Sequence, residues 1–158
     1  MKVFISHQKV DSELAGGIAK RLHETHQIEC YLDIIDPNAS QAGDELGEHL
    51  RNELGKCTQL MAVVSENTKS SWWVPWEIGV ATEKDYPIAT FARDNTPLPE
   101  YLKKWPYLKT AADLDEYAKV TKTIANTLKL RKSYLTEASA RRSSTQEFYR
   151  ILRGTLGQ

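Results

Sequence analysis

Short apolar runs alternate with amphipathic stretches over the first 110 or so residues of the chain. The apolar runs lie at 3–6, 28–34, 60–64 and 86–91, and their β-prone residues predict buried strands. A brief fifth strand is predicted at 107–108. Strands that alternate with helices need crossover connections, so the pattern predicts a parallel sheet covered by helices on both faces.

Helices are predicted between the strands, where leucines and isoleucines recur about every four residues. Asp11 with Ser12 offers an N-cap for the first helix, and Asp44 offers one for the second. From residue 112 a stripe of apolar residues predicts a long helix that continues towards residue 135. Around 141–144 we expect a break, because Ser144 and Glu147 form a capping-box signal for a short last helix.

These elements divide the chain into a domain of residues 1–130 and a C-terminal helical extension of residues 131–158. In parallel sheets, ligands bind beyond the carboxyl ends of the strands. Three segments are expected to meet there: Ser6 to Lys9, the long polar loop that follows the second strand, from Asp33 to Gly43, and Ser65 to Glu77.

The most informative segment is Ser70–Ile78, which holds three tryptophans and one carboxylate. Serines followed by Pro75 are typical of a helix start, and Trp73 and Glu77, four residues apart, share one face of that helix. The segment follows the third predicted strand. An aromatic side chain beside an acid at such a junction is suited to stack on the flat ring of a ligand, while the acid interacts with positive charge near that ring.

Composition narrows the class of protein. The 158 residues suffice for one domain with a core, and 21 basic against 21 acidic side chains give no support for nucleic-acid binding. No apolar run approaches the ~18 residues of a membrane span, and the chain enters a strand without a signal-peptide pattern, so we expect a cytoplasmic protein. Cys30 and Cys57 are expected to be buried free thiols rather than a disulfide or a metal site.

Several catalytic motifs are missing from the sequence. It contains no phosphate-binding G-x-x-x-x-G-K-[ST], no dinucleotide G-x-G-x-x-G after the first strand, and no G-x-S-x-G elbow. His23 and His26 do not form an H-E-x-x-H motif, and no metal site is predicted. Asp33 with Asp36 is faintly similar to the acidic pocket of receiver domains, but the first strand supplies no acidic pair to complete it.

Four features together carry a resemblance to a known family. They are the first strand and turn at 3–7, the end of the second strand at 31–33, the loop that leads to 42–43, and the tryptophan segment at 71–78. Over about residues 2–130 the chain resembles the Toll/interleukin-1 receptor (TIR) domain family, close to its bacterial, plant and axonal NAD-cleaving branch. The Trp-x-x-x-Glu pair of Trp73 and Glu77 is the most specific part of the resemblance.

The resemblance implies a flavodoxin-like α/β fold with five parallel strands. It also implies cleavage of NAD⁺, as a substrate and without a cofactor, to nicotinamide and ADP-ribose or a cyclic ADP-ribose, with Glu77 as the catalytic residue. The loop at about 33–44 matches the BB loop. The implied substrate-binding residues are Phe4, Ser6, His7, Asp33, Asp36, Gly43 and Trp73. His7 departs from many members, which carry an aromatic or another polar residue there, and residues 131–158 have no counterpart.

The chemistry is consistent with this resemblance. Breaking the nicotinamide–ribose bond develops oxocarbenium character, which one carboxylate beside the sugar can stabilise. Because a neutral pyridine leaves, a general acid is not required. Each of these residues also has a structural interpretation. The helix dipole favours an acid such as Glu77 near a helix start, and Trp73 can be a core anchor. Packing or interface roles are the alternative for Trp72 and Trp76, and a strand end with its turn is the alternative for Ser6 and His7.

The family also implies partners. Its enzymes self-associate through TIR–TIR contacts that close the NAD⁺ site, and in bacterial antiphage defence their nucleotide product activates a separate effector. A virulence factor acting in a host cell would use the same chemistry, whereas a non-enzymatic adaptor would act by homotypic association alone. Residues 129–158 hold seven basic and two acidic side chains, a balance of plus five, which is expected to be a solvated helix surface or else a contact with an acidic partner.

Overall fold

The protein folds around a five-stranded parallel sheet with strand order β2-β1-β3-β4-β5. The computed structural model describes residues 1–32, 43–92 and 96–158. The strands follow the predicted apolar runs: β1 Lys2–Ser6, β2 Glu29–Leu32, β3 Gln59–Val64, β4 Ile88–Ala92 and β5 Tyr107–Leu108. The predicted flavodoxin-like α/β fold, with five parallel strands, is therefore confirmed.

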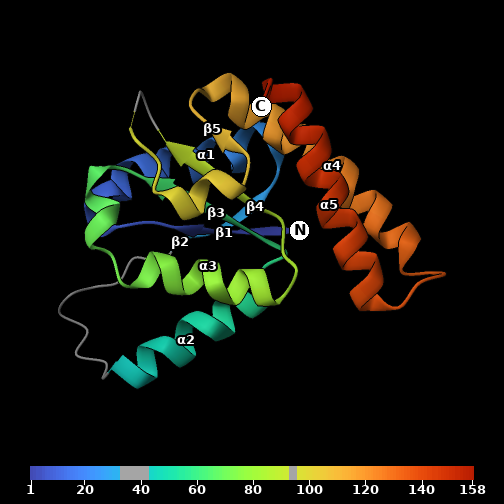
Figure 1. Cartoon of the computed structure of the whole chain (residues 1–158), viewed down its shortest axis with the longest axis horizontal. Helices are drawn as coiled ribbons and strands as arrows, with labels where there is room; N and C mark the ends of the chain where they lie inside the picture. Colours follow the sequence, from blue (N-terminus) through green and yellow to red (C-terminus); the bar gives the residue numbers. More distant parts are fainter. Residues whose placement is uncertain (33–42, 93–95) are drawn as a thin grey trace.

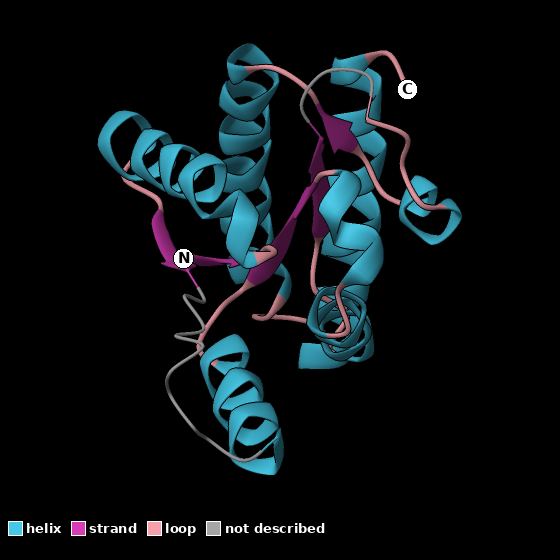
Figure 2. Ribbon diagram, turned by 90° about the vertical axis from the view of Figure 1, so that its left-hand side faces the viewer, coloured by secondary structure: helices cyan, strands magenta, loops and turns pink. Residues whose placement is uncertain are grey.

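Helices cover both faces of the sheet (Figures 1 and 2). They are α1 Ser12–His26, α2 Gly43–Gly55, α3 Trp73–Glu83, α4 Ala111–Arg131 and α5 Glu137–Leu156. Short 3₁₀ helices lie at η1 Lys9–Asp11, η2 Glu66–Ser70 and η3 Glu100–Lys104. The second helix begins at Gly43, one residue before Asp44, the predicted N-cap.

Strand alternation divides the core into two halves. Val3 and Ile5 of β1 pack on one face with α1, α4 and α5, whereas Phe4 points to the other face and packs with α2 and α3. All three side chains are fully buried, and every residue of β3 is buried as well. Burial on both faces explains why β3 reads as an apolar run from Leu60 to Val64 rather than as an alternating pattern.

The predicted break at 141–144 is wrong, because α5 runs without interruption from Glu137 to Leu156. The chain turns earlier, at 132–136, and Thr136 caps α5 by accepting a hydrogen bond from the backbone of Ser139. Ser144 is buried inside the helix and accepts a hydrogen bond of 3.1 Å from Arg131 of α4. Arg131 also pairs with Glu147 at 2.6 Å. Ser144 and Glu147 therefore connect α5 to α4 through Arg131 and do not start a helix.

The last helix shares the core of the sheet. Phe148 and Leu152 are fully buried with α4, and the backbone N–H of Ile88 in β4 donates a hydrogen bond of 3.2 Å to the hydroxyl of Tyr149. Thr145 donates another, of 2.7 Å, to the carbonyl of Asp85. Residues 137–156 thus stabilise the sheet directly; the domain boundary at residue 130 stays a prediction.

Both cysteines are free, as predicted, with Cys57 buried and Cys30 half-buried. Burial raises the pKa of Cys30 to about 12 and that of Cys57 to about 11, so both thiols are poor nucleophiles at neutral pH. Within the described part of the chain, we find no helix whose length and apolar character would let it cross a bilayer.

Candidate active site

The sheet order creates a switch point between β1 and β3. From β1 the chain moves outward to β2 on one side, and from β3 it moves outward to β4 and β5 on the other. Connections that leave in opposite directions open a crevice at the carboxyl edge of the two central strands. Ser6 is the last residue of β1, and Ser65 directly follows β3, so both serines lie at this edge.

Glu77 is brought to this edge by α3. The carboxylate oxygen Oε2 of Glu77 accepts a hydrogen bond from the hydroxyl of Ser6. Ser6 is fully buried, and Glu77 is 2% exposed. A buried carboxylate is costly unless hydrogen bonds replace the water that it loses. The prediction that the segments Ser6–Lys9 and Ser65–Glu77 meet at the carboxyl edge is therefore confirmed, whereas most of the third segment, Asp33 to Gly43, lies outside the described residues.

The local sequence explains where α3 begins. The hydroxyl of Ser71 accepts a hydrogen bond of 3.2 Å from the backbone of Val74, which satisfies one of the free N–H groups of the first turn. Pro75 also lies in the first turn, where its missing N–H costs nothing. The helix begins at Trp73, between the serines and the Pro75 that predicted its start, so Trp73 and Glu77 lie one turn apart on the same face.

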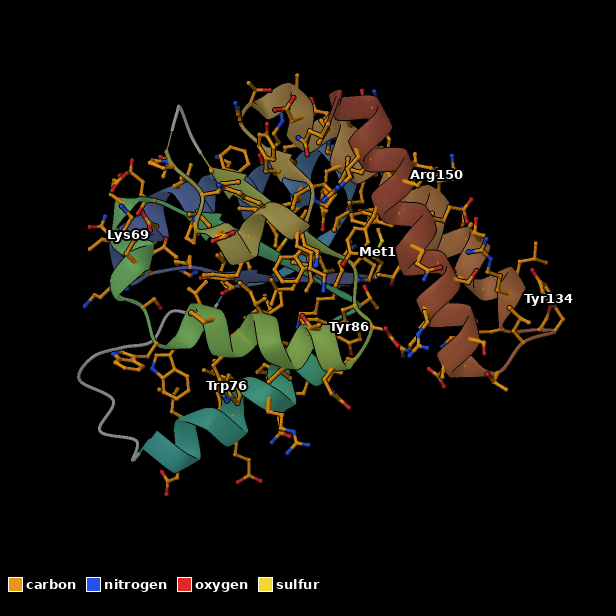
Figure 3. All side chains as sticks on the ribbon, viewed as in Figure 1. Met1, Lys69, Trp76, Tyr86, Tyr134 and Arg150 are labelled. Carbon is orange, nitrogen blue, oxygen red and sulfur yellow. The ribbon has the colours of Figure 1, made fainter. Side chains whose placement is uncertain are left out.

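The three neighbouring tryptophans have different environments. Trp73 is half-buried against the core, and its ring meets that of Trp76 edge-on at 5.7 Å. A Cβ placed on Gly47 of α2 would lie 4.0 Å from the Trp73 ring, so α2 packs against it. Trp76 lies on the side of α3 towards α2 (Figure 3) and is 37% exposed, while Trp72 is 89% exposed. Trp73 thus packs and shapes the edge; ring stacking on a substrate stays a prediction.

His7 follows Ser6 and is held within its own turn. Its Nδ1 lies 3.1 Å from the carbonyl oxygen of Ile5, and its Nε2 lies 3.3 Å from the hydroxyl of Ser12. That hydroxyl also donates a hydrogen bond to the carbonyl of Lys9. Both ring nitrogens therefore have partners nearby, which supports the structural interpretation of His7; a contact with substrate stays a prediction.

The remaining predicted site residues lie in three different settings. Phe4 is fully buried, and its ring centroid lies 5.2 Å from that of Tyr31, so it packs beneath the edge. Substrate can reach Phe4 only if this packing changes. Gly43 is the first residue of α2. Asp33 and Asp36 lie outside the described residues. The substrate-binding roles of all four residues stay predictions.

A second buried carboxylate, which the sequence pattern did not reveal, lies at the same edge. Asp11 precedes α1, but its side chain makes no capping hydrogen bond. Instead, its Oδ2 accepts a hydrogen bond of 2.8 Å from the hydroxyl of Ser65, and Asp11 is 8% exposed. Two serine–carboxylate pairs, Ser6 with Glu77 and Ser65 with Asp11, therefore tie α3 and η1 to the ends of β1 and β3. The Asp11-Ser12 pattern resembled a cap, which concealed this role.

A cavity of about 630 Å³ opens next to Asp11, between α1, the end of β4 and the start of α4. Arg21 and Lys109 contribute positive charge to its walls, but neither Ser6 nor Glu77 lines it. In the described residues, no three histidine, cysteine or acidic side chains cluster closely enough to hold a metal ion.

Comparison with known proteins identifies the family. Residues 3–124 match the family model described as "TIR domain". This chain belongs to the TIR domain family. Trp73 and Glu77 fall within the matched region, and so does the whole carboxyl edge described above. Residues 125–158, which include the rest of α4 and all of α5, lie beyond the match.

The match to an individual relative covers a shorter part of the chain than the family model does. This TIR domain is 31% identical over 80 residues to a protein of Bacillus cereus (strain MSX-D12) called "Probable 3' cyclic ADP-D-ribose synthase ThsB'". The match covers 49% of the chain and 41% of that relative, so it spans less than half of the relative's length.

Two solved structures share 17% identity with the chain. The TIR domains of the activated Roq1 resistosome, which recognises the effector XopQ, give a TM-score of 0.48, with 99% of this chain and 97% of that chain covered. A prokaryotic SEFIR domain gives 0.47, with 73% and 85% covered.

Proposed function

We propose that this TIR domain is an enzyme that cleaves the nicotinamide–ribose bond of NAD⁺. The observation that carries the proposal is the buried carboxylate of Glu77, held by Ser6 at the switch point of the sheet. A packing helix has no need to bury an acid there. A fixed negative charge at a ligand crevice suits a reaction in which positive charge develops on the substrate.

In this proposal, Glu77 stabilises the oxocarbenium character of the ribose as its bond to nicotinamide breaks. The electron pair of that bond leaves with the nicotinamide nitrogen, which becomes a neutral pyridine. Water or another atom of the same nucleotide then attacks the anomeric carbon and releases its proton to solvent, giving ADP-ribose or a cyclic product. Ser6 acts as a positioning residue, because its hydrogen bond restricts the rotamer of Glu77.

The name of the Bacillus cereus relative, a probable cyclic ADP-ribose synthase, favours a cyclic product. We propose that this product is a signal that activates a separate effector in antiphage defence. The direct experiment is incubation of the purified protein with NAD⁺, followed by mass analysis. Release of nicotinamide with a product of the mass of cyclic ADP-ribose supports a cyclase, and the mass of ADP-ribose supports a hydrolase.

A second candidate is a TIR adaptor that acts by association alone. The side chain of Trp72, the N-cap residue of α3, is 89% exposed, which favours a protein contact. The two functions separate in one assay. An adaptor would release no nicotinamide at any protein concentration, and its association would survive Glu77→Gln.

We further propose that activity depends on self-association, as the family resemblance implies. Specific activity is then expected to rise with protein concentration or with a crowding agent. Trp72→Ala tests the contact, because the exposed ring can be removed without opening the core. Constant specific activity over a hundredfold dilution, with a monomer by light scattering throughout, would contradict this dependence.

A further inference from the structure

A second cavity lies at the opposite end of the sheet from Glu77. It has a volume of about 220 Å³ and is enclosed by α4, α5 and the chain just before and at the start of β3 and β4. Figure 3 shows Met1 and Tyr86 at the end of the sheet that faces α5. The reaction proposed for Glu77 makes no use of this region.

The inner wall of the cavity is largely apolar. Ile124, Ala125 and Leu128 of α4 face Phe148 of α5 across it. An apolar cavity of ~150 Å³ is large enough to bind benzene, so this one accommodates an aromatic ring or a short alkyl chain. Two buried polar residues of its lining bond to each other, because Thr121 donates a hydrogen bond of 3.2 Å to Gln59. An apolar body fits this interior without breaking a hydrogen bond.

The mouth of the cavity carries excess positive charge. Among the charged side chains that line the cavity, three are cations, Lys129, Lys132 and Arg141, and one is a carboxylate, Asp85, so the side-chain balance is plus two. Lys132 and Arg141 share one partner outside the cavity, because each lies 2.8 Å from the same oxygen of Glu137. In the described part of the chain, Lys129 has no carboxylate within ion-pair distance.

One of these cations is fixed in place. The guanidinium of Arg141 lies over the ring of Tyr86, with 5.5 Å between its Cζ and the ring centroid. Arg141 also donates to Glu137 through Nε and Nη2, so its position depends on two neighbours. A positioned guanidinium beside an apolar cavity is suited to hold an anionic group at the mouth while an apolar group fills the interior.

We propose that this cavity is a binding site for a small amphipathic anion. Its ring or short alkyl chain lies between Leu128 and Phe148, and its carboxylate, sulfonate or phosphate lies among Lys129, Lys132 and Arg141. The ligand bridges α4 and α5, so its binding stabilises the packing of α5. The site is separate from Glu77, and the proposal stands whether or not the protein cleaves NAD⁺.

The test uses the whole chain with octanoate as the probe and 1-octanol as an uncharged probe of equal length. Binding is followed by amide shifts in ¹⁵N–¹H spectra at low salt. We expect saturable shifts at Ala125, Ser144 and Thr145, with octanoate at least tenfold tighter than octanol. Raising the salt concentration is expected to weaken octanoate binding more than octanol binding.

Two variants on α4 and its end locate the anion. The double change Lys129→Gln with Lys132→Gln removes exposed charges at the mouth and is expected to weaken octanoate binding at least tenfold without affecting octanol. Lys122→Gln, an exposed change on the same helix but outside the cavity, is the control and is expected to change neither. Equal affinity for the two probes, shifts scattered over the surface, or full octanoate binding by the double variant would overturn the proposal.

Discussion

The hydroxyl of Ser6 donates a hydrogen bond to Oε2 of Glu77, a residue 71 positions later in the chain. Ser6 ends β1, and Glu77 lies in the second turn of α3, so the bond joins the central part of the sheet to the helix that carries the candidate catalytic acid. Both side chains are buried. The carboxylate therefore has a fixed place at the carboxyl edge of the sheet before any ligand arrives.

Removing this bond tests whether Glu77 must be positioned. In Ser6→Ala, the carboxylate loses a hydrogen bond to a charged group, an interaction of ~1.5–3 kcal/mol. If that energy acts in the transition state, kcat for nicotinamide release falls roughly 10- to 150-fold while KM changes little. Steady-state kinetics on the folded variant measures the two constants separately.

The matched control is Ser65→Ala at the same edge of the sheet. The hydroxyl of Ser65 donates a hydrogen bond to Asp11 rather than to Glu77. Its loss is therefore expected to lower the free energy of unfolding and to have little effect on kcat. Unfolding in urea and the same kinetic assay compare the two alanine variants. An unchanged kcat in folded Ser6→Ala, or an equal loss of kcat in both variants, would contradict the positioning role.

Trp73 is expected to stabilise the fold. Truncating a fully buried aromatic residue costs ~3–5 kcal/mol, and because Trp73 is half-buried we expect about half of that for Trp73→Ala. Trp72→Ala removes a ring that is 89% exposed and is expected to cost less than ~0.5 kcal/mol. Urea unfolding compares them, and equal costs would show that Trp73 does not anchor α3.

Trp73→Phe separates packing from ring stacking. Phenylalanine keeps a ring against α2 and is expected to restore most of the stability that Trp73→Ala loses. If Trp73→Phe also releases nicotinamide at the wild-type rate, Trp73 acts on the site through packing. If its stability recovers but its KM for NAD⁺ is higher than that of the wild type, the indole itself contacts substrate.

An ion-pair cluster between α1 and α4 predicts a pH dependence of stability. Asp115 accepts hydrogen bonds of 2.8 and 2.7 Å from Arg21 and lies 2.8 Å from Nε2 of His26. The guanidinium of Arg21, followed by His26, holds the pKa of the Asp115 carboxyl well below its usual range. Because the folded-state pKa is lowered, this stabilisation is present above the unfolded pKa of ~3.9 and is lost as the pH falls below it.

Asp115→Asn tests that dependence. Solvent screens this partly exposed cluster, so we expect the variant to be less stable than the wild type at pH 7 by about 1 kcal/mol. The difference is expected to shrink as the pH falls below about 4. Chemical unfolding from pH 7 to pH 2 measures both curves, and a difference that stays constant over this range would exclude the cluster as its source.

Residue patterns were enough to predict the sheet and the start of α3, because both depend on local signals. The apolar runs specify buried strands, and Ser71 with Pro75 specifies the first turn of α3. Pairs that form across the fold were harder to predict. Asp11 has the sequence appearance of a helix cap, yet it bonds to Ser65, 54 positions away. Ser144 likewise pairs with Arg131 of another helix. A short polar side chain has the same sequence signature in either setting.

Only part of the candidate site could be predicted, again because residues that pair across the fold leave no local pattern in the sequence. The family resemblance singled out Glu77 and placed Ser6 beside the crevice, and their contact follows from the parallel order of β1 and β3. The cations around the second cavity gave no such signal. Lys129, Lys132 and Arg141 lie on two helices and around the turn between them, and in sequence they are part of an ordinary basic tail.

The most direct test of the catalytic role of Glu77 is nicotinamide release by Glu77→Gln at high protein concentration. Glutamine keeps the shape of the side chain and removes the negative charge, so the fold is expected to survive. Loss of this electrostatic stabilisation costs at least ~2.7–4 kcal/mol in the transition state, or about a hundred- to a thousandfold in rate. If Glu77 is the catalytic residue, the folded variant releases nicotinamide at least a hundredfold more slowly than the wild type. Release at the wild-type rate would contradict that role.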